Sequence, residues 1–251
     1  MAESAAGSEP GAATPPSGRS PVAVAEDLLV ACKLGEPTAA HEAALADATD
    51  ADLRPVRNDR RTALAFWINC YNAGTQLLLE THPERYDSPL RMLRFFLAPA
   101  ITVAGTDLPL DRIENGLLRG GRSKYGLGYL PKVLVTGFER RYRLVDCDPR
   151  IHFALNCGAE SCPPIRAYEP ARIDDQLDIA TRSYLDATVE YDPDAGTVAV
   201  PRVFLWFRGD FGGGAGIREF LRAHGAIPAD AAPRIRHRSW DWSKAAGKFV
   251  E

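Results

Sequence analysis

The side chains best suited to chemistry are concentrated in one stretch of the chain, residues 148–165. This stretch holds a histidine (His152), two cysteines (Cys157 and Cys162), an asparagine, a serine and two carboxylates, and its other residues are largely apolar. Polar groups that interrupt an apolar segment need a structural or functional reason to be there. We therefore expect any active or binding site to be built around this stretch.

A nucleophilic thiol is the first chemistry that these residues predict. A cysteine attacks as its thiolate, and a neighbouring histidine commonly holds it in that form. We predict Cys162 as the nucleophile and His152 as the base, for acyl transfer or for hydrolysis of an amide or peptide bond. A third group must orient the imidazole, and Asn72, Glu160 and Asp241 suit that task by type. We favour Asn72, as the orienting or oxyanion-binding group.

Two other interpretations of the same residues remain open. A cysteine in an apolar segment is often a small buried hydrophobe, and a single histidine is often structural, which would make the chain a non-enzymatic interaction module. Zinc is the other alternative, because His152, Cys157 and Cys162 are suitable ligands and Cys147 could supply a fourth. Their spacing is not a usual zinc pattern, so we predict no metal and no cofactor.

The elements that must position this chemistry follow from the hydrophobic pattern. We predict a short buried strand at 151–155, after which Gly158, Pro163 and Pro164 place Cys162 on a stiff loop. The strongest helix is predicted at 60–81, capped by Asp59 and apolar on almost every side. Asn69, Asn72 and Gln76 form an amide stripe along it, which either binds neighbouring backbone or points Asn72 into a site.

The rest of the chain predicts a mixture of helices and short strands. The further helices are expected at 21–33, 37–48, 86–98, 111–119, 174–185, 202–207 and 217–223. Hairpins are expected at 101–110 and 187–200, and single strands at 132–136 and 141–145. The glycines at 212–214 predict a flexible turn. Residues 1–20 are rich in Ala, Gly, Pro and Ser and predict a disordered tail, followed by one domain at 21–251 on which the helices of 21–58 pack.

Composition limits the partners that the chain can have. The 251 residues are 45% hydrophobic and 25% charged, with a formal net charge of −3, which is typical of a globular protein. That charge gives no support for a nucleic-acid partner, and no apolar run is long enough for a membrane span. Five cysteines, an odd number, favour a reducing cytoplasm over a disulfide framework. The expected partner is an unidentified small-molecule or peptide substrate.

Several segments resemble a known family, the domain of unknown function DUF547. The resemblance rests on Ala65-Phe-Trp-Ile-Asn-Cys-Tyr-Asn-Ala73, on Asp148-Pro-Arg-Ile-His-Phe-Ala-Leu-Asn-Cys157, on Ser161-Cys-Pro-Pro164 and on shorter matches at 113–119, 206–211 and 240–243. The motif residues that it implies here are Asn69, Asn72, Glu114, Arg119, His152, Cys157, Ser161, Cys162 and Asp241.

The resemblance implies a fold but little function. The predicted fold class is α+β, with helices around a small, mainly antiparallel sheet, and it is similar to papain-like and transglutaminase-like folds. In such folds a central helix packs on a sheet whose strand carries the histidine. A fold by itself does not establish an activity. From the motif residues and their neighbour Glu160 we expect four contacts to the substrate: Asn69, Glu160, Ser161 and Arg119.

Overall fold

The computed structural model describes residues 18–250. The predicted disordered tail therefore lies almost entirely outside the described residues. Helix α1 (Pro21–Leu34) begins where the sequence predicts, because Pro21 occupies its first turn and the Ser20 side chain accepts a hydrogen bond from the Ala23 N–H.

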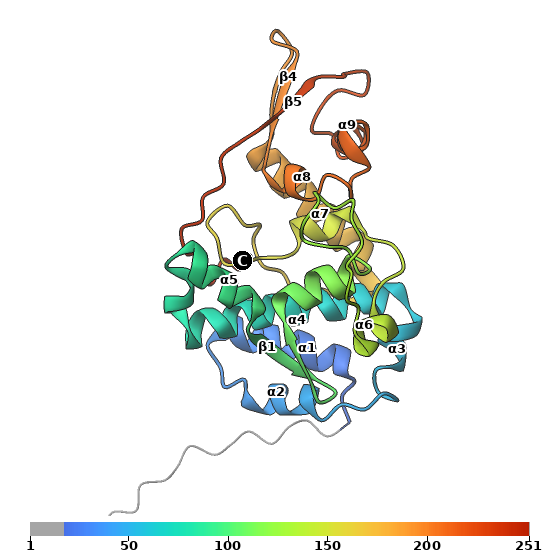
Figure 1. Ribbon diagram of the computed structural model, residues 1–251, viewed down its shortest axis with the longest axis vertical. Helices are drawn as coiled ribbons and strands as arrows, with labels where there is room; N and C mark the ends of the chain where they lie inside the picture. The colour runs from blue at the N-terminus through green and yellow to red at the C-terminus, as the bar shows by residue number, and fades with distance from the viewer. Residues whose placement is uncertain (1–17, 251) are drawn as a thin grey trace, which may run out of the picture.

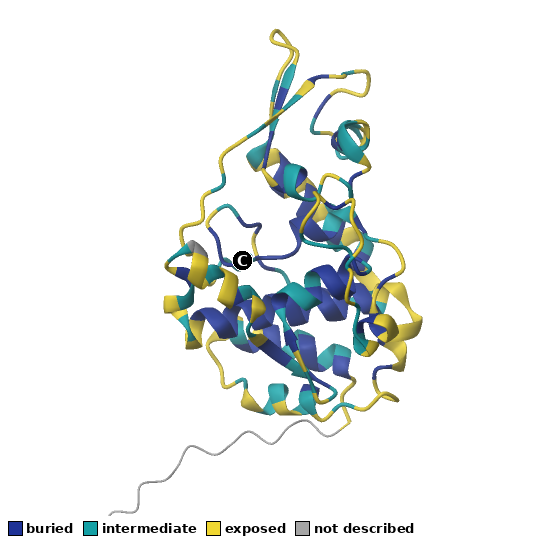
Figure 2. Ribbon diagram, viewed as in Figure 1, coloured by how far each residue is buried: buried dark blue, intermediate teal, exposed yellow. Residues whose placement is uncertain are grey.

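Helix α4 (Arg60–Thr81) is the centre of the fold, and its predicted bounds are confirmed. Asp59 caps it by accepting from the Thr62 N–H at 2.8 Å, and every residue from Ala63 to Leu79 is buried. Helix α1 packs along one side of it, and strand β1 (Pro99–Val103) packs on another. Figure 2 shows this buried helix inside the lower half of the molecule.

The remaining elements surround α4 or extend beyond it (Figure 1). The helices are α2 (Ala39–Ala46), α3 (Arg54–Asn58), η1 (Pro83–Tyr86), α5 (Pro89–Leu97), η2 (Arg112–Leu118), α6 (Gly137–Tyr142), η3 (Pro149–Phe153), η4 (Pro170–Arg172), α7 (Ile173–Thr188), α8 (Val203–Trp206) and α9 (Gly213–Ala223). The other strands are β2 (Thr106–Pro109), β3 (Glu190–Asp192), β4 (Thr197–Val200) and β5 (Arg234–His237).

The strands form two small sheets, which confirms the α+β class. Strands β1 and β2 make an antiparallel hairpin, with Thr102 opposite Asp107. In the second sheet β4 lies between β3, which is antiparallel to it, and β5, which is parallel to it. Both predicted hairpins are therefore confirmed. In the described part of the chain, no helix combines the length and the apolarity that a bilayer crossing requires.

Three predicted strands are wrong. Residues 151–155 begin in the 3₁₀-helix η3, because Asp148 caps that turn by accepting from the Arg150 N–H. Residues 141–145 begin inside α6, which Thr136 and Glu139 start with a reciprocal capping box. The apolar residues of 132–136 lie on the surface instead of in a sheet, and Val133 is 94% exposed. The glycines at 212–214 start helix α9 and do not form a flexible turn.

The apolar side chains form two cores that meet at η3. The first core surrounds α4 and includes Ile151, and the second is built from α7, α8, α9 and β4 and includes Phe153. In Figure 1 helix α4 lies below and helices α8 and α9 lie above, and α7 contributes side chains to both cores. His152 lies between Ile151 and Phe153 in the chain, so the predicted base is held at the junction of the two cores.

Candidate active site

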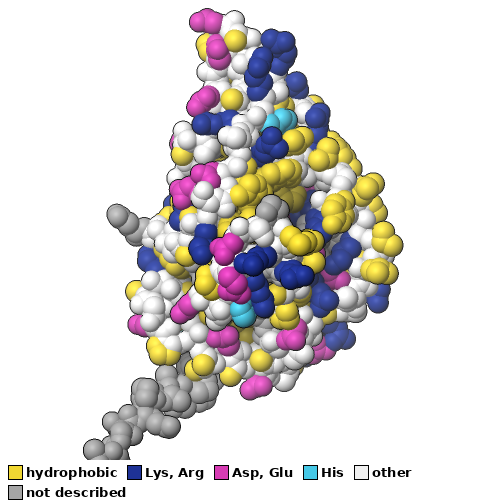
Figure 3. All heavy atoms as spheres, turned by 60° about the vertical axis from the view of Figure 1, so that its left-hand side comes forward, with side chains coloured by type: hydrophobic (Ala, Val, Ile, Leu, Met, Phe, Trp, Pro, Cys, Tyr) yellow, Lys and Arg dark blue, Asp and Glu magenta, His cyan; other side chains and the backbone are white. Residues whose placement is uncertain are grey.

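A pocket of about 120 Å³ lies at this junction. Its walls are mainly aromatic, contributed by Tyr71, Phe96, Trp206, Phe207, Trp240 and Trp242. Four side chains that can do chemistry also line it: Glu114, His152, Cys157 and Cys162. Figure 3 shows hydrophobic side chains gathered around a hollow on the face that carries α5. The structure thus brings Cys162 and His152 to one pocket, as the sequence predicts.

The two cysteines lie on a tightly closed loop. Asn156 closes it, because its side-chain N–H donates to the Pro163 carbonyl at 2.7 Å and its oxygen accepts from the Gly158 N–H at 2.8 Å. The chain reverses at Gly158, whose φ of +88° is in the left-handed region that glycine adopts without strain. The loop returns Cys162 to Cys157, and the Cys157 N–H donates to the Cys162 sulfur at 3.2 Å.

The surroundings of Cys162 favour its thiolate. Burial opposes the charge, but hydrogen bonds from the Cys157 thiol and from the Ala159 and Cys157 N–H groups, together with the Lys248 ammonium, leave the pKa of Cys162 lowered. The same pairing raises the pKa of Cys157 well above its ordinary value, chiefly through the hydrogen bond to Cys162 and then through burial. Of the two thiols, Cys162 is therefore the one with the lower pKa.

His152 is held by a carboxylate that the sequence did not single out. Its Nε2 is 2.9 Å from an oxygen of Asp210, and its ring stacks on Phe207 with centroids 4.0 Å apart. Burial lowers the pKa of His152, although Asp210 partly opposes this, so the ring is neutral at pH 7. Because a carboxylate can only accept, Nε2 carries the proton and Nδ1 is the basic atom.

Asp210 is fixed by Arg119 and by a close backbone contact. Arg119 donates to both oxygens of Asp210, at 2.6 and 3.1 Å, and both side chains are fully buried. Burial would raise the pKa of Asp210, but the bonds from His152 and Arg119 lower it to about 2. A side chain at Gly209 would place its Cβ 2.5 Å from the backbone of Gly128, so only glycine allows this approach.

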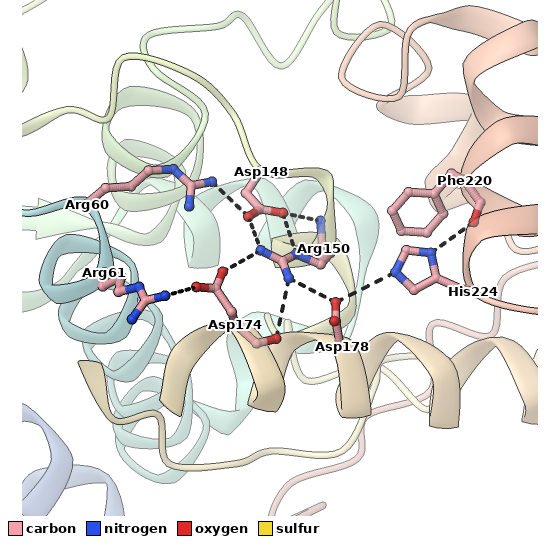
Figure 4. A network of polar contacts seen from close by, with 8 residues as sticks. All are labelled: Arg60, Arg61, Asp148, Arg150, Asp174, Asp178, Phe220 and His224. Atoms are coloured by element: carbon pink, nitrogen blue, oxygen red, sulfur yellow. Dashed lines mark hydrogen bonds and ion pairs between the residues drawn. The ribbon is translucent and has the colours of Figure 1, made fainter. Parts of the chain in front are cut away.

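A second polar network sets the position of η3 (Figure 4). Arg150 donates to Asp148, to Asp174 and to Asp178, with distances of 2.7 to 3.0 Å for these side-chain bonds. Asp148 also accepts from Arg60 of α4 at 2.8 Å. These bonds connect the turn that carries His152 to both α4 and α7. We infer that Arg150 positions the imidazole although it lies outside the pocket.

Glu114 is a further ionisable group of the pocket. It lies on η2, a π-helical segment, a type of helix that often marks functional positions. Burial raises the pKa of Glu114 to about 7, although Arg119 partly opposes this shift. The Tyr71 hydroxyl is 3.4 Å from its carboxylate. A carboxyl with a pKa near 7 can both donate and accept a proton at neutral pH.

The amide side chains along α4 hydrogen-bond to neighbouring backbone segments. The Asn72 side chain donates to the Ala154 carbonyl at 3.0 Å and accepts from the Asn156 N–H at 2.9 Å. Asn69 makes the equivalent pair of bonds with the backbone of Tyr168. Both amides are fully buried and their hydrogen bonds go to backbone, so the structure does not bring them to the pocket.

The other residues predicted to contact the substrate also bind other parts of the protein. Arg119 is 1% exposed and binds Asp210, as described above. Glu160 and Ser161 dock the C-terminal segment: the Glu160 N–H donates to the Ser243 carbonyl, and the Ser161 hydroxyl accepts from the Asp241 N–H, both at 2.8 Å. Docking of this segment brings Trp240 and Trp242 to the pocket.

The carboxylate that contacts the His152 ring is therefore Asp210, and the ring is not held by Asn72, Glu160 or Asp241. Sequence reasoning named Glu114 as a motif residue but gave it no role in the site. Asp210 lies in a segment that resembles the family motifs, at 206–211, and this is the signal that could have singled it out.

In papain-like folds a strand carries the histidine, whereas here His152 lies on the 3₁₀-helix η3.

A metal would fit poorly at the histidine. In the described residues, donor atoms of Cys147, His152 and Asp210 lie within 4.8 Å of one another, and this is not the predicted His152, Cys157 and Cys162 set. The Arg119 guanidinium already occupies both oxygens of Asp210 and would repel a divalent cation. Zinc therefore has little support at this position.

Comparisons with known proteins agree with the motif resemblance. Neither the curated proteins nor the solved structures give a significant match to the chain. A family model does match, over residues 56–185, which is more than half of the chain and includes α4, Glu114, His152 and both pocket cysteines. The chain belongs to the family described as "Protein of unknown function, DUF547".

Proposed function

We propose that the pocket performs thiol-dependent acyl transfer or amide hydrolysis, with Cys162 as the nucleophile. The observation that carries the proposal is that a thiol with a lowered pKa and a carboxylate-held histidine line the same pocket. Nucleophile, base and orienting carboxylate are the parts that acyl-transfer enzymes share on unrelated folds.

The reaction would proceed in two steps. In the first, the Cys162 thiolate attacks the carbonyl carbon of the substrate, and the leaving group departs with a proton. Glu114 suits this proton donation, because its pKa of about 7 keeps much of it protonated at neutral pH. In the second, Nδ1 of His152 accepts a proton from water or from an acceptor alcohol or amine as that group attacks the thioester. This step releases the acyl group and restores the thiolate.

The oxyanion of each step needs hydrogen-bond donors. The Gly158 N–H, a backbone donor on the cysteine loop, already donates to Asn156 at 2.8 Å. The Tyr71 hydroxyl is a donor that lines the pocket and, unlike Glu114, it gives up no proton in either step. We assign the oxyanion to Tyr71, since donors that are fixed before the reaction stabilise developing charge most effectively.

The substrate class follows from the walls. Five aromatic side chains besides Tyr71 line a space of about 120 Å³, which favours a small apolar or aromatic acyl group over a charged one.

We further propose that the protein works in a reducing compartment such as the cytoplasm, because its five cysteines are free thiols.

Acylation by an activated ester tests the proposal. The full chain is incubated with p-nitrophenyl acetate, and the site that gains an acetyl group is identified by peptide mass spectrometry. We expect acetylation of Cys162, none in Cys162→Ser, and persistent acetyl-enzyme in His152→Gln because deacylation is slowed. Cys32→Ser is the matched control and should behave as wild type. Acetylation at random lysines alone, with Cys162 unmodified in the folded protein, would refute the proposal and favour an interaction module.

A further inference from the structure

Cys157 and Cys162 form a pair of thiols with no intervening group. The Cys162 sulfur accepts the Cys157 N–H at 3.2 Å, and both residues line the same pocket as free thiols. A disulfide needs Cβ atoms about 3.5–4.5 Å apart, and a sulfur that touches the backbone of its partner residue is within reach of that geometry. A single nucleophilic thiol would not need this second cysteine.

The loop supports such a pair in a fixed arrangement. Asn156 closes the loop from inside, and its side chain is fully buried. The C-terminal segment holds it from outside, because the Ala245 N–H donates to the Gly158 carbonyl at 2.8 Å and Lys248 donates to the Cys162 carbonyl at 3.2 Å. The two sulfurs therefore cannot easily move apart, and the loop need not unfold for them to join.

The two thiols also differ in the way that a reactive and a resolving cysteine differ. The pKa of Cys162 is lowered and that of Cys157 is raised. Oxidation by peroxides begins at the more ionised thiol, and a neighbouring neutral thiol then condenses with the product. The aromatic pocket gives a small oxidant access to Cys162.

We propose that Cys157 and Cys162 are an oxidisable dithiol, which a hydroperoxide converts to a reversible disulfide. The Cys162 thiolate attacks the peroxide O–O bond and becomes a sulfenic acid, and the second peroxide oxygen leaves as an alkoxide or hydroxide that takes up a proton. The Cys157 sulfur then attacks the Cys162 sulfur, the S–S bond forms, and one water departs with the Cys157 proton. The two thiols lose two electrons and the peroxide gains them. A small dithiol reverses the change.

This inference depends on the geometry of the two thiols and not on acyl transfer. If the proposed function also holds, the disulfide removes the nucleophile and stops acylation until it is reduced. Oxidation would then turn the pocket off.

The chain offers a clean assay, because trypsin should release both cysteines in one peptide, residues 151–166. The reduced full-length protein is treated with a small excess of hydrogen peroxide, denatured with N-ethylmaleimide to label free thiols, and digested. We expect this peptide to lose two hydrogens and to carry no label, and to carry two labels after reduction with dithiothreitol. Cys147 should stay labelled throughout.

Two variants separate the steps. In Cys157→Ser the sulfenic acid has no partner, so dimedone should label Cys162. In Cys162→Ser, Cys157 should remain a labelled thiol after peroxide treatment. Circular dichroism confirms that each variant is folded. Two labels on the wild-type peptide after peroxide, or a disulfide that joins Cys162 to another cysteine, would overturn the proposal. A disulfide in a protein that p-nitrophenyl acetate never acylates would support this inference and refute only the acyl-transfer proposal.

Discussion

Replacing Glu114 by glutamine should remove a large part of the pH dependence of stability. Burial raises the pKa of Glu114 in the folded protein to about 7, from an ordinary value of 4.5. The folded state therefore keeps a proton that the unfolded chain releases, and the free energy of unfolding falls as pH rises from 4.5 to 7. Above pH 7 both states are ionised and the loss is complete.

The size of this effect follows from the shift. Each pKa unit corresponds to about 1.4 kcal/mol, so the whole shift costs the folded protein about 3 kcal/mol above pH 7. Between pH 5 and pH 8 the wild type should lose about 2.5 kcal/mol more stability than Glu114→Gln, because the amide has no proton to release. The other titrating groups, such as His152, are present in both proteins, and their contributions cancel in the comparison.

Urea unfolding followed by tryptophan fluorescence measures this difference. Unfolding curves for wild type and Glu114→Gln are recorded at half-unit steps from pH 5 to pH 8, with Glu219→Gln, at an exposed position on α9, as the matched control. We expect the Glu114→Gln profile to be flatter and the Glu219→Gln profile to follow the wild type. Parallel profiles for wild type and Glu114→Gln would refute the raised pKa, and with it the assignment of Glu114 as the proton donor.

Three further substitutions test the parts that hold the pocket. Asp210→Asn leaves the buried Arg119 without its counter-charge and should lower the free energy of unfolding by about 3–5 kcal/mol, measured in urea. Asn72→Ala leaves a buried carbonyl and a buried N–H without partners, so we expect the free energy of unfolding in urea to fall by about 2–5 kcal/mol. Arg150→Met removes the bonds to Asp148 and its neighbours on α7, and should cost about 2 kcal/mol by thermal unfolding. It should also slow deacylation, because η3 no longer holds the imidazole firmly.

These three outcomes separate structural roles from catalytic ones. An Asn72→Ala protein that keeps its stability but cannot be acylated would restore Asn72 as a catalytic group. If Asp210→Asn is as stable as wild type, the pair with Arg119 is not buried as described. For Arg150→Met, unchanged deacylation in a destabilised protein would show that η3 is positioned by its apolar contacts alone. Asp241→Asn, at an exposed carboxylate, is the control for the charge changes.

Local sequence signals predicted a large part of the helical structure. Helix α4 is the clearest case, because Asp59 supplies its cap and the long apolar run supplies its burial. The hairpin of β1 and β2 followed from a turn sequence between two short apolar runs. These signals act between residues that are close in sequence, so they need no knowledge of the rest of the fold.

The strands predicted at 132–136 and 151–155 are absent because local sequence signals do not settle the structure of a short apolar run. An apolar run of five residues fits a strand, a short helical turn or an exposed loop equally well, and only its surroundings decide. At η3 the helical turn is set by Asp148, because its side chain caps the turn and also binds Arg60 and Arg150. Arg150 lies two residues along the chain from Asp148, but Arg60 lies 88 residues away.

The sequence by itself determined which side chains are candidates for the chemistry: His152 and Cys162 were identified from residue type and from their place in one apolar segment. Only the tertiary structure decided what surrounds them. It brought Asp210, 58 residues along the chain, to His152, placed Glu114 in the same pocket, and turned Asn72 and Arg119 toward structural bonds. The physical reason is that a pKa depends on burial and on charges within a few ångströms. Those distances are set by the packing of the two cores, and sequence spacing does not contain them.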